Sequence, residues 1–127
     1  MKTSQKKGLL IVEDDAEMAS LLKDYLKEDG YDIWSAGNGA EALVLASRKA
    51  FDLIITDIRM PGLTGLDILP GFRKLHPAVP IIAITAFGSR EMCQKSLERG
   101  ATAYLENPIC LNQLGRLIHE IIGGSKK

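Results

Sequence analysis

The sequence predicts a doubly wound α/β sheet with helices on both of its faces. Five short apolar segments alternate with five amphipathic segments, in repeats of about 20 to 25 residues, and this alternation is typical of parallel sheets with crossover helices. Right-handed crossovers place such helices on both faces of the sheet. The chain has 127 residues, a length that suits one hydrophobic core. We therefore expect a single domain.

The first two repeats occupy residues 8–46. The apolar run at 8–12 is expected to be a strand that is buried on both faces. Asp15 can cap the helix that follows, because apolar side chains, Leu21 among them, recur at helical spacing until Gly30. A second strand and a second helix, separated by a Gly-Asn-Gly turn, are predicted at 32–36 and 40–46.

The remaining three repeats follow the same pattern. Aliphatic runs of strand length alternate with longer segments of helical period, and glycine, proline or asparagine separates them. The predicted elements are strands at 53–56, 81–85 and 103–105 and helices at 66–75, 90–99 and 111–122, with a loop at 59–65. This places the domain at 8–122, between an N-terminal tail at 1–7 and a C-terminal tail or truncated linker at 123–127.

Composition excludes several classes of protein. Sixteen basic and sixteen acidic residues balance, so no net field favours direct binding of nucleic acid or of an anionic membrane. The apolar runs are too short to span a bilayer, and the N-terminus lacks the apolar core of a signal peptide, so a cytoplasmic protein without a membrane span is expected. Cys93 and Cys110 lack the spacing of a metal or redox motif and are expected to be free thiols.

Acidic and polar residues follow the predicted strands. Parallel sheets bind ligands beyond the carboxyl ends of their strands, where these side chains converge. Converging carboxylates repel each other unless a cation joins them, and Mg²⁺ prefers oxygen ligands. An aspartate beside such an ion can accept a phosphoryl group as a nucleophile. The residues at these strand ends are Glu13, Asp14, Asp15, Asp57, Thr85, Ala86 and Asn107.

The chain also resembles the receiver domains of two-component response regulators from about residue 8 to residue 122. The motifs that carry the resemblance are IVEDD at 11–15, ITDIRMPG at 55–62, ITAFG at 84–88, GATAY at 100–104 and LENP at 105–108. The resemblance implies a flavodoxin-like sheet with strand order 2-1-3-4-5. It also implies a phosphoacceptor switch rather than an enzyme, with only self-directed transfer and hydrolysis.

The resemblance assigns roles to individual residues. Asp57 is expected to be the phosphoacceptor, and a Mg²⁺ cofactor is expected to bind Glu13, Asp14, Asp57 and the backbone carbonyl of Arg59. The Thr85 hydroxyl and the backbone N–H of Ala86 are expected to donate to the phosphoryl oxygens. Tyr104 corresponds to the switch aromatic of the family, although a purely packing role remains an equal alternative.

The resemblance also implies partners. The phosphoryl donor would be a sensor histidine kinase or a histidine phosphotransfer protein. The surface formed by the helix at 90–99, the strand at 103–105 and the helix at 111–122 would contact an output domain or another partner, or form a homodimer. Some phrases are similar to receivers that precede enhancer-binding ATPase and DNA-binding domains.

One position departs from the family pattern. Receivers normally carry a lysine before the proline that follows the last strand, and here that residue is Asn107, followed by Pro108. A lysine ammonium forms a charge-assisted contact with phosphoryl oxygens, and an amide lacks that charge. The alternative function is therefore an atypical receiver that binds its partner without regulated phosphorylation. A dehalogenase-type phosphatase is disfavoured because Arg59 occupies the position of its second aspartate, and a flavin site lacks its phosphate loop.

Overall fold

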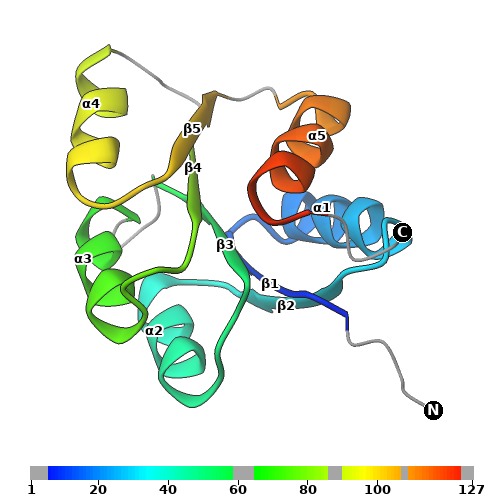
Figure 1. Cartoon of the computed structure of the whole chain (residues 1–127), viewed down its shortest axis with the longest axis horizontal. Coiled ribbons are helices and arrows are strands. Elements are labelled where there is room, and N and C mark those ends of the chain that lie inside the picture. Colours follow the sequence, from blue (N-terminus) through cyan, green and yellow to red (C-terminus); the bar gives the residue numbers. More distant parts are fainter. Residues whose placement is uncertain (1–5, 59–64, 86–89, 107–108, 124–127) are drawn as a thin grey trace.

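The computed structural model describes residues 6–58, 65–85, 90–106 and 109–123, without the side chains of 65–67 and 92. It contains a five-stranded parallel sheet in the order β2-β1-β3-β4-β5 (Figure 1). The elements are β1 Gly8–Val12, α1 Ala16–Glu28, β2 Asp32–Ala36, α2 Gly39–Arg48, β3 Leu53–Asp57, α3 Gly65–Leu75, β4 Ile81–Thr85, α4 Arg90–Glu98, β5 Ala103–Glu106 and α5 Leu111–Ile122.

The helices cover the sheet in two layers. Helices α1 and α5 lie on one face, and α2, α3 and α4 lie on the other (Figure 1). Two hydrophobic cores result, because alternate residues of each strand point to opposite faces. In β1, Leu9 and Ile11 pack in the core beneath α1 and α5, whereas Leu10 and Val12 pack in the core beneath α2 and α3. The sheet is therefore apolar on both sides, as the uninterrupted apolar run predicted.

Local capping explains where the first two helices begin. Asp15 accepts hydrogen bonds from the backbone N–H groups of Glu17 and Met18 at 3.0 and 3.3 Å, so α1 begins where the sequence predicted. Asn38 accepts from the backbone N–H of Glu41 at 2.8 Å, so α2 begins at Gly39. Both caps lie at the edge of the sheet where the strands end, which brings helix N-termini to that edge.

The fold class and the strand order predicted from the sequence are confirmed. Several element bounds differ by one or two residues from the predicted ones. Helix α2 runs to Arg48 rather than to residue 46, and β3 includes Asp57 itself. Leu21, which is part of the apolar pattern that predicted α1, is 51% exposed. None of the described helices combines the length and the apolar character that spanning a bilayer requires.

Candidate functional site

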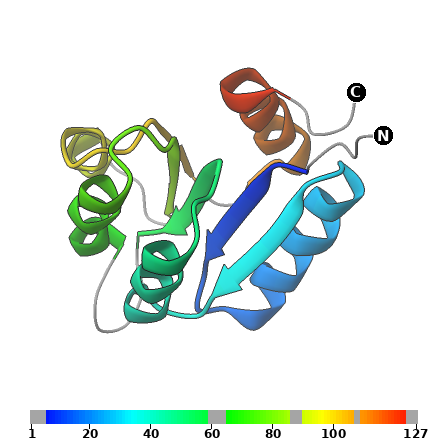
Figure 2. The ribbon, with the colours of Figure 1, turned by 60° about the horizontal axis from the view of Figure 1, so that its bottom comes forward.

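The sheet brings the predicted acidic residues to one edge. Strand β1 lies between β2 and β3, and Val12 is in register with Thr56, so Glu13 emerges next to Asp57. Figure 2 shows β1 and β2 side by side with their arrowheads at the same end. Because parallel strands end together, residues that are distant in sequence meet at this edge.

Glu13, Asp14 and Asp57 form an acidic cluster. Each offers a carboxylate oxygen, and the three oxygens lie within 4.8 Å of one another. Their exposure differs: Glu13 is buried, Asp57 is half-buried and Asp14 is exposed. The cluster therefore has one desolvated carboxylate at its base and one at the solvent boundary, as expected of a cation site that stays open to water and to an incoming ligand.

Backbone hydrogen bonds hold this cluster in place. The N–H of Glu13 donates to the carbonyl of Ala36 at 3.0 Å, which ties the end of β1 to β2. The N–H of Asp15 donates to the Glu13 carboxylate at 3.1 Å. Beyond Asp57, the N–H of Ile58 donates to the carbonyl of Ile84 at 2.8 Å. Asp15 itself caps α1, so its carboxylate serves the helix rather than the cluster.

Burial changes the protonation of the cluster. The pKa of Glu13 is raised to about 8, chiefly by burial, and the negative charges of Asp57 and Asp14 and a side-chain hydrogen bond with Asp57 contribute to this rise. The hydrogen bond from the Asp15 N–H opposes this rise of the pKa. Without a cation, Glu13 therefore holds a proton near neutral pH, and a divalent ion would displace it.

The donor set suits a hard divalent ion. Carboxylate oxygens on a partly open edge match the preference of Mg²⁺, which binds one or two carboxylates and keeps several waters. Beside Glu13 and Asp14 lies a hollow of about 350 Å³ between α1 and the end of β2. It is lined by small side chains and by Lys23.

Thr85 and Tyr104 lie on neighbouring strands. Thr85 ends β4 and is fully buried, and Tyr104 of β5 is in register with Ala83. Tyr104 packs, partly buried, against the same core as Ala83. Thr85 is two residues beyond Ala83 and so points to that same face. The structure thus places the predicted switch hydroxyl and the predicted switch aromatic on one side of the sheet.

Three predicted site residues fall outside the described part of the chain. These are Arg59 with its backbone carbonyl, Ala86 with its N–H, and Asn107 with the bond to Pro108. Lys23, in contrast, was not predicted. It lies seven residues after Ala16 on α1, hence on the same helix face, but no local pattern showed that this face meets the acidic edge.

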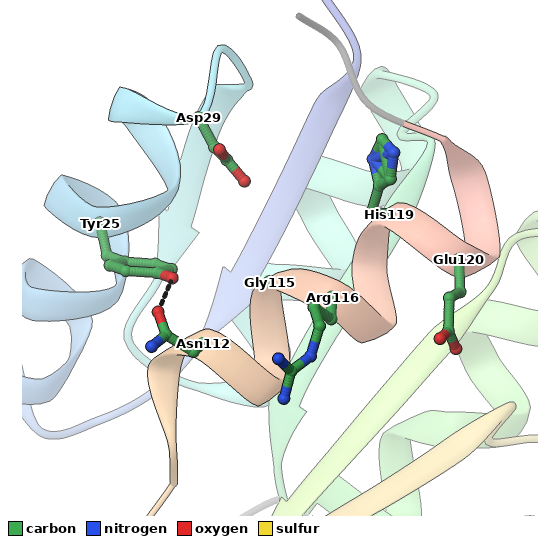
Figure 3. A pocket seen from close by; sticks show the side chains of 7 residues that line it. All are labelled: Tyr25, Asp29, Asn112, Gly115, Arg116, His119 and Glu120. Carbon is green, nitrogen blue, oxygen red and sulfur yellow. Dashed lines mark hydrogen bonds between the residues drawn. The ribbon is translucent and has the colours of Figure 1, made fainter.

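One further sequence prediction, for the cysteines, can be compared with the structure. Cys93 and Cys110 are free thiols, as predicted. A hollow of about 570 Å³ that the sequence did not predict lies between α1 and α5, and its lining does not include Glu13, Asp14 or Asp57 (Figure 3). His119 is exposed on its wall.

Comparison with known proteins identifies related chains. A family model described as the response regulator receiver domain matches residues 9–119. The transcriptional regulatory protein ZraR of Salmonella typhimurium is 32% identical over 122 residues, which are 96% of this chain and 28% of that protein. The chain spans about a quarter of the length of the curated relatives it matches.

Solved structures agree with this result. A CheY-like receiver domain protein from Methanospirillum hungatei has a TM-score of 0.88 and 32% identity, with 91% of this chain and 93% of that chain covered. A response regulator protein from Burkholderia pseudomallei, solved with a phosphorylated aspartic acid, a calcium ion and citrate, has a TM-score of 0.83 and 26% identity. There the match covers 91% of this chain and 66% of that chain.

Proposed function

This chain belongs to the response-regulator receiver family of two-component systems, and from that premise we propose that it is a switch that accepts a phosphoryl group on Asp57. The observation that carries the proposal is the acidic cluster: three carboxylate oxygens within 4.8 Å of one another at the carboxyl ends of neighbouring strands. A structural role alone does not account for three neighbouring acids, one of which, Glu13, has its pKa raised by burial and by the charges of the other two.

Asp57 is the acceptor in this proposal because of its position and exposure. It is half-buried, so a donor can reach it, and it ends the strand beside the one that leads to Glu13 and Asp14. A carboxylate oxygen of Asp57 bonds to phosphorus while the phosphorus–nitrogen bond of a donor phosphohistidine breaks. The imidazole leaves with the bonding electron pair and takes up a proton. The Burkholderia relative with its phosphorylated aspartic acid supports this chemistry.

Glu13 and Asp14, together with Asp57 and the Arg59 carbonyl, would hold Mg²⁺. When bound, this ion neutralises negative charge on the transferring oxygens. Glu13 contributes a carboxylate that binding deprotonates, and Asp14 remains at the solvent boundary.

Thr85 and Tyr104 would transmit the conformational response to phosphorylation from Asp57 to the output surface. The Thr85 hydroxyl is proposed to donate to a phosphoryl oxygen, together with the N–H of Ala86. Tyr104 lies on the strand next to Thr85 and on the same face of the sheet, which supports a coupled movement of the two side chains. The output surface would then be α4, β5 and α5, contacted by an output domain, a partner or a second copy.

The wider assignments belong to this proposal as well. The receiver unit would span 8–122, flanked by tails at 1–7 and 123–127, and act in the cytoplasm. A histidine kinase or a phosphotransfer protein would supply the phosphoryl group. Because the curated relatives are about four times longer, a regulatory output such as transcription is proposed for a larger protein of that kind.

The test is the intact mass of the chain after incubation with acetyl phosphate and Mg²⁺. We expect one phosphoryl adduct, lost in Asp57→Asn, and faster formation in Asn107→Lys because the restored ammonium contacts the phosphoryl oxygens. Asp15→Asn is the matched control, since Asn can still cap α1. No adduct on either the parent or Asn107→Lys would overturn the proposal. An adduct on Asn107→Lys alone would favour the atypical receiver.

A further inference from the structure

Helices α1 and α5 enclose a hollow of about 570 Å³ that the acidic cluster does not use. This volume lies within the range of small-molecule pockets in proteins. Gly115 of α5 is buried at its base, and across one end the Tyr25 hydroxyl donates to the side-chain oxygen of Asn112 at 2.9 Å (Figure 3). The hollow therefore offers a ligand space together with groups that orient it. The other lining side chains are charged or titratable: Asp29, Arg116, His119 and Glu120.

Two acceptor oxygens meet above Gly115. A Cβ at this position would lie 3.5 Å from the Tyr25 hydroxyl and ring and 3.9 Å from a carboxylate oxygen of Asp29. These are ordinary contact distances, so alanine would fit, and the missing methyl group leaves the space free. The Tyr25 hydroxyl gives its proton to Asn112, and its oxygen can still accept a hydrogen bond. A positively charged ammonium group above Gly115 would thus meet both a carboxylate and a hydroxyl lone pair.

Folding alone does not favour the residues at this point. Gly115 lies inside α5, where glycine is less favourable than alanine. Asp29 is the C-terminal cap residue of α1, where the negative end of the helix dipole disfavours a carboxylate. Within the described part of the chain, the Asp29 side chain forms neither a hydrogen bond nor an ion pair, and in Figure 3 it points toward α5. Two residues that disfavour their own helices therefore face one hollow, which a bound cation explains.

Arg116 supplies a positive charge on the same wall. It directly follows Gly115 on α5 and is exposed. Glu120, one helical turn later, forms no ion pair with it among the residues that the structure describes, and in Figure 3 the two side chains do not meet. The guanidinium therefore keeps its donors for a bound carboxylate, which it can contact through two parallel hydrogen bonds.

We propose that this hollow binds a free α-amino acid. The α-ammonium group lies above Gly115 between Asp29 and the Tyr25 hydroxyl, and the carboxylate contacts Arg116. The side chain extends along α5 toward His119, which is one helical turn beyond Gly115 on the same face. A ligand with one kind of charge would leave either Asp29 or Arg116 unmatched, so a zwitterion suits the lining better. The site shares no residue with the acidic cluster, so binding requires neither Mg²⁺ nor phosphorylation.

Amide chemical shifts of the isotopically labelled full chain test the proposal at neutral pH and low salt. The probes are the natural amino acids, followed by the amide and the N-acetyl derivative of the tightest binder. The amide lacks the carboxylate, and the N-acetyl derivative lacks the ammonium group. We expect at least one amino acid to shift the signal of Gly115 with a millimolar dissociation constant, and each derivative to bind about tenfold more weakly. Asp57→Asn should bind the amino acid as the parent does.

Substitutions separate ligand binding from folding. Asp29→Asn and Gly115→Ala should each weaken binding by about tenfold or more, because the first removes the charge opposite the ammonium group and the second fills its space. Both should also raise the melting temperature of the free chain, since each removes a feature that disfavours its helix. Asp24→Asn, an exposed change of the same charge on α1, is the matched control and should leave binding unchanged. Arg116→Gln should bind the amino acid no better than its amide.

Several results would overturn the proposal. One is a chain in which no natural amino acid shifts the Gly115 signal at millimolar concentration. Another is an amide that binds the parent as tightly as the amino acid does, or an Asp29→Asn chain that binds as well as Asp24→Asn. A lower melting temperature in both Asp29→Asn and Gly115→Ala would also contradict it, because these residues would then serve the fold rather than a ligand.

Discussion

Replacing Glu13 by glutamine should remove a loss of stability that the parent protein suffers as the pH rises. In the metal-free protein the pKa of Glu13 is raised from 4.5 to about 8, chiefly by burial. The folded state therefore binds a proton that the unfolded state releases between those two pH values. The stability that this proton provides is fully present below pH 4.5 and is lost as the pH rises through about 8.

The size of this loss follows from the shift. At 1.36 kcal/mol per pKa unit the full shift corresponds to about 5 kcal/mol, but the cluster opens to water, and screening reduces the effect to about 2 kcal/mol. Glu13→Gln cannot ionise, so at pH 9 it should exceed the parent in unfolding free energy by that amount. At pH 5 the two should be nearly equal.

Urea denaturation between pH 5 and pH 9 in the presence of EDTA measures this difference. Asp15→Asn is the matched control, because its carboxylate caps α1 outside the cluster and asparagine caps equally well. Mg²⁺ at ten times its dissociation constant should raise the unfolding free energy of the parent at pH 9 by about 1.4 kcal/mol. The same Mg²⁺ concentration should stabilise Glu13→Gln less, because the variant has lost one of the carboxylates that would bind the ion. If Glu13→Gln keeps the pH slope of the parent, the buried carboxylate is not the cause and the reasoning fails.

Three further predictions concern the charge of Asp57, the backbone conformation of Gly100 and the hydrogen bonds of Arg73. Asp57→Asn should raise the metal-free stability at pH 8 by about 1–2 kcal/mol, since it removes a charge that repels Glu13, and a urea titration that shows a loss would contradict this. Gly100→Ala should lower the unfolding free energy by about 2–4 kcal/mol, because φ is +120° and a Cβ would lie 2.7 Å from the Arg73 side chain. A thermal midpoint equal to that of the parent would refute this prediction. Arg73→Ala should lower the unfolding free energy by a similar ~2–4 kcal/mol, because the guanidinium donates to the carbonyls of Gly100 and Val79. In the same thermal assay Arg73→Lys should recover only part of this stability.

The order of the elements could be predicted because each leaves a local mark in the sequence. The aliphatic run of β1 is too short for a helix, and Asp15 and Gly30 bracket a helical period. The meeting of Glu13 and Asp57 also followed, since parallel strands end at one edge. Strand order did not follow from periodicity, which carries no information on neighbours. It came from the resemblance to receivers.

Other features depend on tertiary packing and could not be predicted from local pattern. Leu21 belongs to the apolar pattern of α1 but is exposed, whereas Leu22 and Leu26 are buried in the core beneath α1 and α5. Which apolar residues of α1 are buried depends on where α5 packs, and the local pattern does not contain this information. The raised pKa of Glu13 depends on how deeply the sheet edge buries it. Lys23 reaches the acidic edge only because α1 packs beside the end of β2. Each of these properties arises from contacts between segments that are distant in sequence.

The most direct test of the account is to locate the phosphoryl group. Borohydride reduces an aspartyl phosphate to homoserine, so phosphorylation with acetyl phosphate and Mg²⁺, reduction and peptide mass spectrometry identify the acceptor. We expect homoserine at position 57 and its absence when Mg²⁺ is chelated. Homoserine at Asp14 or another carboxylate, or none in a chain whose acidic cluster binds Mg²⁺, would contradict the claim that Asp57 is the phosphoacceptor.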